Sequence, residues 1–135
     1  MSAKNLSLGL DSSTQSLTAV LVDIDDGSVI YERSLNYAKD DRLNGFGINH
    51  TEYICPPREE GEAEQPPQMY LASLDALFAD MKADGVDMGA VRVINDSGQQ
   101  HGHVYLGPKA LDLLAKLNAD VSGSRDLVDI VGSCF

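Results

Sequence analysis

An aspartate followed by a hydroxyl-rich turn is the first group of residues that could do chemistry. Residues 8–16 read LGLDSSTQS, and Asp11 stands where a predicted strand ends. Because Mg²⁺ binds few carboxylates and keeps much of its water, one well-placed aspartate suits a metal that carries nucleotide phosphates. The N–H groups of the turn and the hydroxyls of Ser13 and Thr14 can donate hydrogen bonds to phosphate oxygens. The same composition is common in ordinary turns, so the residues alone leave both interpretations open.

A second polar cluster follows another predicted strand. Residues 97–103 read SGQQHGH, and two glycines bracket Gln99, Gln100 and His101. Amide and imidazole groups both donate and accept hydrogen bonds, which suits them to sugar hydroxyls. The carboxyl end of a strand in an α/β sheet is also where ligands usually bind. A surface loop with an incidental histidine remains the alternative.

Other constellations are weak. His101 and His103 have a spacing that can bind zinc, but His50 and Cys55 are the further imidazole and thiol candidates and lie far away in the sequence. The pattern of a phosphate-binding P-loop is absent, and no Ser-His-Asp arrangement stands out. We therefore assign neither a zinc site nor a catalytic triad.

The elements that must position the two motifs begin with three short strands. Apolar and β-branched residues predict strands over 5–10, 17–24 and 28–36. Gly27 tolerates the positive φ of a tight hairpin between the second strand and the third. Short turns between all three predict an antiparallel meander at the start of the domain. Residues 37–68, rich in Gly and Pro and carrying the acidic run EEGEAE, predict a long irregular connection.

The second half of the chain alternates helix and strand. Apolar residues at helical spacing, with prolines at the start and Gly85 past the end, predict a helix over 67–84. This apolar stripe consists of Tyr70, Leu71, Leu74, Leu77, Phe78 and Met81. The apolar run 90–95 predicts a buried strand that lies parallel to an earlier one, because a helix separates them. Further predictions are a strand over 103–106, a helix that opens at Pro108, and a short helix within 124–131. This order predicts an α/β domain with a mixed sheet.

Length and charge narrow the class of protein. The chain of 135 residues fits one domain, and its formal net charge of −11 disfavours nucleic acid and anionic membrane surfaces as partners. A nucleotide is still allowed, because one phosphate tail needs only a local set of donors. There is no long apolar run, no secretory signal and no cysteine framework, so a cytoplasmic setting is expected.

Both motifs resemble segments of a known family. The sequence GLDSSTQS is similar to the first phosphate-binding hairpin of the FGGY carbohydrate kinases, which belong to the actin-like ATPase superfamily. The sequence GQQHG, followed by Val104 and Tyr105, resembles the sugar-contacting segment of the xylulokinase branch. The head and body of the predicted helix match as well, so the resemblance covers nearly the whole chain in the right order. Ser13, where many relatives carry Gly, and the pair Asn95-Asp96, where small residues are usual, depart from the pattern and leave the exact sugar open.

The resemblance implies a partial actin-like, or ribonuclease H-like, α/β domain whose mixed sheet starts with an antiparallel three-strand meander. It implies that residues 1–135 are the N-terminal portion of a first kinase domain whose second domain is absent. Asp11 would face Mg²⁺ and the phosphates of ATP, and Ser13 and Thr14 would line the phosphate turn. Gln100 and His101 would contact the sugar.

The function that this resemblance implies is ATP-dependent phosphorylation of a ketopentose such as D-xylulose. The family's catalytic base and adenine pocket lie in later segments, so we assign no catalytic residue and expect the 135-residue chain alone to be inactive. A non-catalytic sugar- or nucleotide-binding module is the alternative. An ATPase that acts on protein partners, as Hsp70-type domains do, is a third possibility that the GQQHG segment disfavours.

Overall fold

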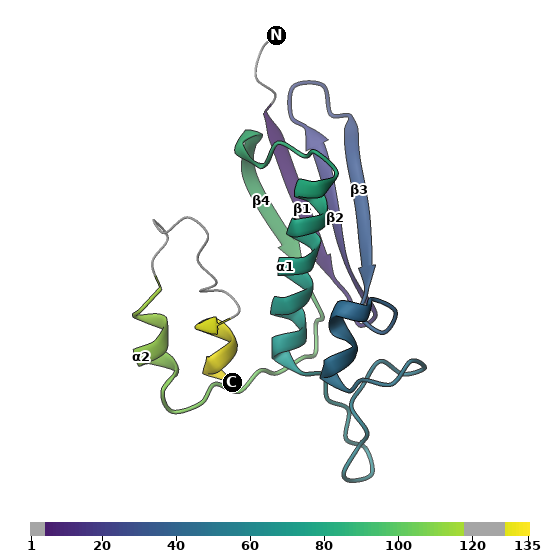
Figure 1. The fold of residues 1–135 in the computed structure, drawn as a ribbon, viewed down its shortest axis with the longest axis vertical. Helices are drawn as coiled ribbons and strands as arrows, with labels where there is room; N and C mark the ends of the chain where they lie inside the picture. Colours follow the sequence, from purple (N-terminus) through teal and green to yellow (C-terminus); the bar gives the residue numbers. More distant parts are fainter. Residues whose placement is uncertain (1–4, 118–128) are drawn as a thin grey trace.

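A computed structural model describes residues 5–117 and 129–135 of the chain. Its sheet has four strands, and the long helix α1 lies against one face of it (Figure 1). In chain order the elements are β1 (Leu6–Ser12), β2 (Ser16–Asp23), β3 (Val29–Asn36), the 3-10 helix η1 (Asp41–Phe46), α1 (Pro67–Ala83), η2 (Met88–Ala90), β4 (Val91–Ser97), α2 (Ala110–Leu114) and η3 (Val131–Cys134). Among the described helices, none is long and apolar enough to pass through a lipid bilayer.

The sheet order is β3-β2-β1-β4, which confirms the predicted mixed sheet. The pairs β1–β2 and β2–β3 are antiparallel and form the expected meander, whereas β1 and β4 are parallel. Gly27 has a φ of 75° and its N–H donates to the Asp23 carbonyl at 2.8 Å, so the hairpin turn needs its glycine. The fold class predicted from the sequence is thus confirmed.

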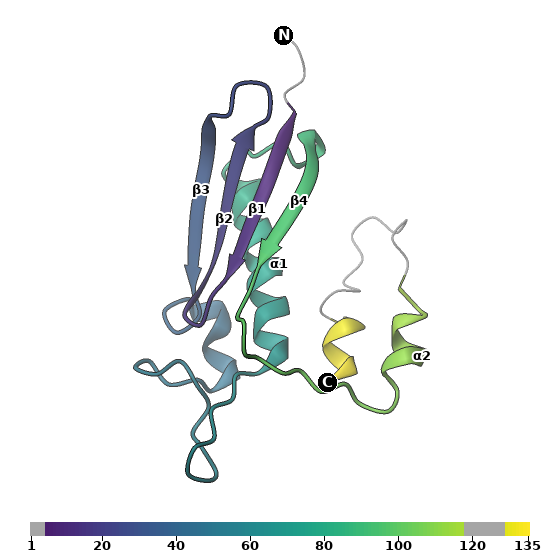
Figure 2. The same ribbon diagram turned by 180° about the vertical axis from the view of Figure 1, so that it is seen from behind.

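One face of the sheet carries the core. Leu8 on β1 pairs with Leu21 on β2, and both are buried against α1, where Leu77 and Met81 are also fully buried. The residues on either side of Leu8 along β1, and of Leu21 along β2, point to the opposite face, because side chains alternate along a strand. Figure 2 shows that opposite face, with the strands in front of α1.

Helix α1 begins and ends where its flanking residues predict. Pro66 and Pro67 open it, and Gly85, with a φ of 84°, follows its last turn. Its most deeply buried positions, Met69, Ser73, Ala76, Leu77 and Met81, are not quite the apolar stripe that the sequence predicts. Tyr70, Leu74 and Phe78 of that stripe are only partly buried at its edge.

A network of ion pairs joins the C-terminal end of α1 to β3 and η1. Arg42, at the start of η1, contacts Asp40 at 2.6 Å and Asp80 of α1 at 2.8 Å. Arg33 of β3 contacts Asp80 at 3.1 Å and Asp84 at 2.9 Å. Hydrogen bonds from Arg42 hold the pKa of Asp80 and the pKa of Asp40 below their usual values. The network therefore fixes β3 and η1 on the same end of the helix.

Three expectations about the second half are wrong or only partly met. Residues 103–106 form no strand, and Tyr105 is 86% exposed, because no neighbouring strand is there to pair with this segment. Strand β4 is parallel to β1 as predicted, but it is not buried: residues 92–97 are all exposed. The helix after Pro108 is present as the short α2. The predicted helix within 124–131 falls largely outside the described residues.

Candidate functional site

The two motifs lie at the same edge of the sheet. Because β1 and β4 are parallel neighbours, their carboxyl ends meet, and Asp11 is the register partner of Ser97. The turn 13–15 leaves the end of β1, and the segment 98–103 leaves the end of β4 (Figure 2). The fold thus brings together two polar clusters that are far apart in the sequence, at the edge where α/β sheets usually bind ligands.

The first turn is closed by its own serine. The Ser13 N–H donates to the Ser16 carbonyl at 2.9 Å, and the Ser13 hydroxyl donates to the same carbonyl at 3.1 Å. The Ser13 hydroxyl oxygen also accepts hydrogen bonds from the N–H groups of Gln15 and Ser16. Thr14, by contrast, is exposed at the tip. The Ser13 hydroxyl therefore shapes the turn, and its predicted contact with phosphate stays a prediction.

Asp11 lies on the sheet face that α1 does not cover. It lines a hollow of about 280 Å³ with residues of three strands, including Thr18, Asn95, Asp96 and Ser97. One carboxylate beside hydroxyl and amide groups suits a hydrated Mg²⁺, which takes only one or two carboxylates and completes its shell with water and phosphate. Asp11 is the residue that would hold it. Asp96 pairs in register with Leu10, so its side chain belongs to the opposite face of the sheet. Within 5–117 and 129–135, no group of three or more His, Cys, Asp or Glu side chains could form a metal site by itself.

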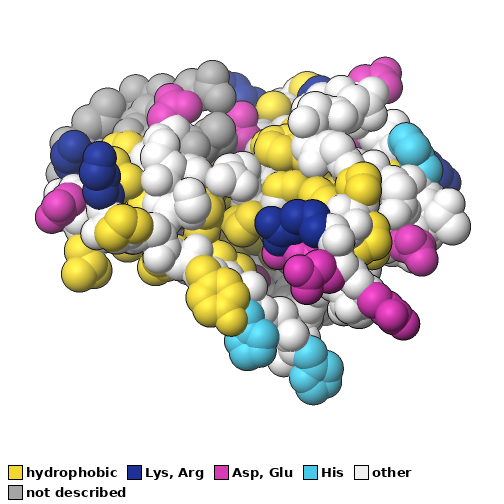
Figure 3. All heavy atoms as spheres, turned by 90° about the horizontal axis from the view of Figure 1, so that it is seen from below, with side chains coloured by type: hydrophobic (Ala, Val, Ile, Leu, Met, Phe, Trp, Pro, Cys, Tyr) yellow, Lys and Arg dark blue, Asp and Glu magenta, His cyan; other side chains and the backbone are white. Residues whose placement is uncertain are grey.

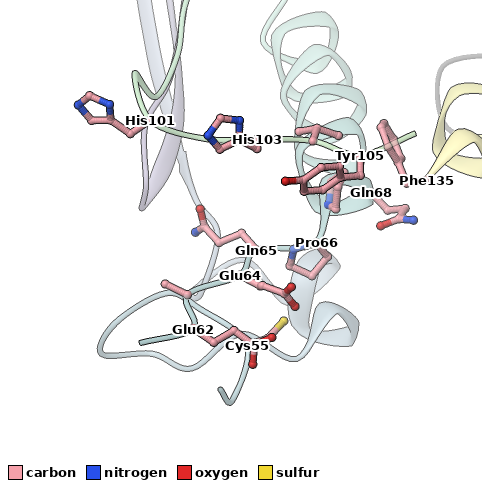
Figure 4. Close-up of a pocket in the computed structure, with 13 residues that line it drawn as sticks. Cys55, Glu62, Glu64, Gln65, Pro66, Gln68, His101, His103, Tyr105 and Phe135 are labelled. Atoms are coloured by element: carbon pink, nitrogen blue, oxygen red, sulfur yellow. The ribbon is translucent and has the colours of Figure 1, made fainter. Parts of the chain in front are cut away.

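His101 lines a second, larger hollow of about 710 Å³, which we call the groove (Figure 4). One wall is the segment after β4, with His101, His103 and Tyr105. The opposite wall is the irregular connection, with Glu64 and Gln65. The view from below shows histidine side chains projecting from the surface beside hydrophobic ones (Figure 3). The groove thus combines apolar lining residues with a few polar groups, as sites for small ligands do.

The structure separates some of the predicted site residues. Asp11 lines the hollow on the open sheet face, whereas His101 lines the groove. Gln100 and His101 are both exposed. In the second motif Gln99 is the residue that binds other side chains: its Nε2 donates to Gln65 Oε1 and to the Tyr70 hydroxyl oxygen, both at 3.0 Å.

Gln65 connects the two motifs. Its Nε2 donates to the carbonyl oxygen of Thr14 at 2.8 Å and to that of Tyr53 at 2.6 Å. Its Oε1 accepts from Gln99 and from the hydroxyl of Tyr70. A single side chain therefore contacts the first turn, the irregular connection, the helix α1 and the second motif.

Two tyrosines support this cluster from the core. Tyr37 is fully buried, its hydroxyl shares a hydrogen bond with Ser12 Oγ at 3.1 Å, and its ring meets the Tyr70 ring edge to face at 5.5 Å. Burial raises the pKa of Tyr37 to about 12 and also raises the pKa of Tyr70. Both phenols are therefore neutral at physiological pH and act as hydrogen-bonding groups.

Sequence reasoning missed the residues of this cluster. Tyr70 counts in the sequence as part of an apolar helical stripe, which hides the role of its hydroxyl. Gln65 stands in an acidic, proline-rich stretch that reads as solvated surface. No local signal in the sequence marks Gln65 as a residue that joins the two motifs.

Comparison with known proteins gives a consistent relationship. No family model matches the chain. It is 34% identical over 124 residues to a protein named probable D-xylulose kinase A from Arthroderma otae, which is 92% of this chain and 20% of that relative. A protein of the same name from Aspergillus terreus is 35% identical over 124 residues, with 92% and 21% covered. D-xylulose kinase A from Aspergillus niger is 33% identical over 114 residues, with 84% and 19% covered.

The chain thus spans about a fifth of the length of the curated relatives it matches. Sequence identity of this level over most of the chain indicates common ancestry. The chain is therefore homologous to sugar kinases of the D-xylulose kinase group, which confirms the relationship to the FGGY carbohydrate kinases that its two motifs predicted.

Proposed function

We propose that the chain is the N-terminal portion of the first domain of an ATP-dependent sugar kinase that phosphorylates a ketopentose such as D-xylulose. The observation that carries this proposal is the meeting of the two motifs at one sheet edge, where Asp11 pairs in register with Ser97. Homology to proteins named D-xylulose kinase supports both the reaction and the class of sugar.

Each predicted site residue has a role in this proposal. Asp11 would hold a hydrated Mg²⁺ at the hollow on the open sheet face. The Ser13 hydroxyl would shape the phosphate turn, and the exposed Thr14 would donate to a phosphate oxygen. The metal supplies positive charge that neutralises the oxygens of the transferring phosphoryl group. Gln100 and His101 hydrogen-bond sugar hydroxyls at the rim of the groove. By the family resemblance, the catalytic base and the adenine pocket would lie in other segments of the kinase.

A pair of substitutions in the full-length protein tests the assignment. Asp11→Asn should lower turnover by about two or more orders of magnitude, because metal and positioned phosphates contribute several kcal/mol to phosphoryl transfer. Stability should change by less than about 0.5 kcal/mol, since Asp11 is exposed. His101→Ala should instead raise the KM for sugar by about 5- to 150-fold, the equivalent of about 1–3 kcal/mol for one lost hydrogen bond, and leave the KM for ATP unchanged.

The measurement is coupled ADP release with a panel of ketopentoses and pentitols, with a thermal melt of each preparation. Asp75→Asn and His50→Ala are matched controls, because both residues are exposed and lie outside the two hollows. A folded Asp11→Asn enzyme with turnover near wild type would remove Asp11 from the site. Wild-type protein that releases no ADP with any sugar would refute the proposed function and favour a binding module.

A further inference from the structure

The side chain of Gln65 uses all of its hydrogen-bonding capacity. A glutamine amide has two N–H donors and an oxygen that accepts two bonds. Both donors of Gln65 are used, toward the carbonyl oxygens of Thr14 and Tyr53, and its oxygen accepts from Gln99 and Tyr70. An amide of this length is therefore the one side chain that satisfies all four partners at once, since a glutamate lacks the donors and a shorter asparagine lacks the reach.

These contacts begin where the sheet stops. The paired register of β1 and β4 ends at Asp11 and Ser97, so backbone pairing fixes their separation only up to that point. Beyond it, the turn and the second motif continue as separate loops. Gln65 touches both, through the backbone of Thr14 on one side and the side chain of Gln99 on the other. Its hydrogen bonds take the place of backbone pairing beyond the ends of the strands, and we call this connection between Thr14 and Gln99 the tie.

Two residues that bond Gln65, Tyr53 and Tyr70, are themselves held in place by other contacts. Tyr53, whose carbonyl accepts from Gln65, has a φ of 63°, a conformation that few residues other than glycine adopt. Its N–H donates to Asn49 Oδ1 at 3.1 Å, and its hydroxyl accepts from Asn36. Strained backbone of this kind persists only where surrounding contacts over-determine it. On the other side, the edge-to-face contact with Tyr37 fixes the ring of Tyr70.

We propose that Gln65 is a positioning residue that sets the spacing between the phosphate turn and the sugar segment. This inference rests on the proposed function and names the residue through which its two half-sites are coupled. This proposal assigns Gln65 no contact with either substrate. It acts through the Thr14 carbonyl, which orients the turn, and through Gln99, the neighbour of Gln100 and His101. Figure 4 shows Gln65 between the segment of His101 and His103 and the connection that carries Glu64.

Three variants take the tie apart. Gln65→Glu keeps the acceptor that serves Gln99 but places a carboxylate against the two carbonyl oxygens, so it breaks the turn side. Gln99→Ala breaks the sugar side alone, and Gln65→Ala breaks both. Asn44→Ala is the control, because it removes an exposed amide that bonds only Asp41 among the contacts described for it.

In the full-length protein, each variant should raise the KM of the substrate whose side of the tie it breaks. Gln65→Glu should raise the KM for ATP about tenfold, Gln99→Ala the KM for sugar about tenfold, and Gln65→Ala both, since one hydrogen bond corresponds to about one factor of ten. The double variant Gln65→Ala/Gln99→Ala should have the same sugar KM as Gln65→Ala, because both changes break one connection. A purely structural role predicts a lower melting temperature with both KM values unchanged, and that result would overturn the inference. Additive effects on the sugar KM would overturn it too.

A second measurement on the 135-residue chain needs no substrate. Backbone ¹⁵N order parameters should fall from about 0.85 toward about 0.6 in both residues 13–16 and 98–101 for Gln65→Ala. They should fall only in 98–101 for Gln99→Ala and in neither segment for Asn44→Ala. Unchanged order in either segment of Gln65→Ala would refute the tie. If wild-type protein phosphorylates no sugar, the proposed function fails, and these order parameters alone decide whether Gln65 couples the two loops.

Discussion

Tyr37 should make the free energy of unfolding depend on pH in the alkaline range. Its side chain is fully buried, and burial is the main cause that raises its pKa from 10.0 to about 12. Between these values the unfolded chain has lost the phenol proton while the folded chain still holds it. Unfolding therefore releases a proton, and the free energy of unfolding falls as pH rises. The stabilisation is fully present below about pH 10 and is lost as pH rises through about pH 12.

The size of the effect follows from the shift. One pKa unit corresponds to about 1.4 kcal/mol, so a shift of about two units predicts a loss of about 2–3 kcal/mol across this range. Tyr37→Phe removes the titrating group and should flatten this part of the profile. At neutral pH the same variant loses its hydrogen bond with Ser12 and should be less stable by about 1 kcal/mol.

The assay is urea unfolding followed by circular dichroism, at steps from about pH 8 to about pH 11.5. Tyr105→Phe is the matched control, because Tyr105 is 86% exposed. The quantity compared is the difference between wild type and variant at each pH, since the pKa values of Tyr31 and Tyr70 are also raised and leave a residual slope in both. Parallel curves for wild type and Tyr37→Phe would refute the reasoning.

Two further predictions concern the C-terminal end of α1. Hydrogen bonds from Arg42 lower the pKa of Asp80, so its contribution is present above the usual 3.8 and is lost as pH falls through the lower folded value. Asp80→Asn should therefore lose about 1 kcal/mol at neutral pH, with a flatter acid limb in urea unfolding; an acid limb as steep as wild type would contradict this. Gly85→Ala should cost about 1 kcal/mol in thermal melts, because Gly85 has a φ of 84° and open space around it, whereas Gly45→Ala, also in open space but without positive φ, should cost nothing. Equal losses at both glycines would show that backbone strain is not the cause.

Local patterns in the sequence predict the first half of the fold closely. The strands expected over 5–10, 17–24 and 28–36 correspond to β1, β2 and β3, because each is an apolar run beside a short turn and pairs with its neighbour in sequence. The helix expected over 67–84 differs from α1 by one residue, since prolines and a glycine mark its ends. Short-range physics decides these elements.

The predictions that fail concern burial and strand pairing, which depend on residues far away in the sequence. The run 90–95 is apolar enough to predict burial, but α1 packs across β2 and β3, and Ile94 of β4 remains 57% exposed. Residues 103–106 have strand-forming types, yet a strand needs a partner, and the described residues offer none. Composition gives the propensity of a segment, whereas its neighbours in space decide whether that propensity is used.

The same limit applies to the site. The two motifs predict Asp11 and His101 as site residues. The parallel pairing of β1 with β4 brings their segments to one edge of the sheet. Nothing local indicates that Gln65 joins them, because its four partners lie on four separate segments of the chain. A side-chain network of this kind becomes visible only in three dimensions.

The connectivity of the sheet also sets an order of folding. Strands β1, β2 and β3 pair with their neighbours in sequence, so their loops close at little entropic cost. The pairing of β4 with β1 spans η1, the irregular connection and α1, and it closes a far longer loop. We therefore expect the hairpins to form first, while the second edge of β1 stays without a partner until β4 has been synthesised. During that interval on the ribosome, an unpaired strand edge is open to other chains, and this edge is where misfolding of the nascent chain should begin.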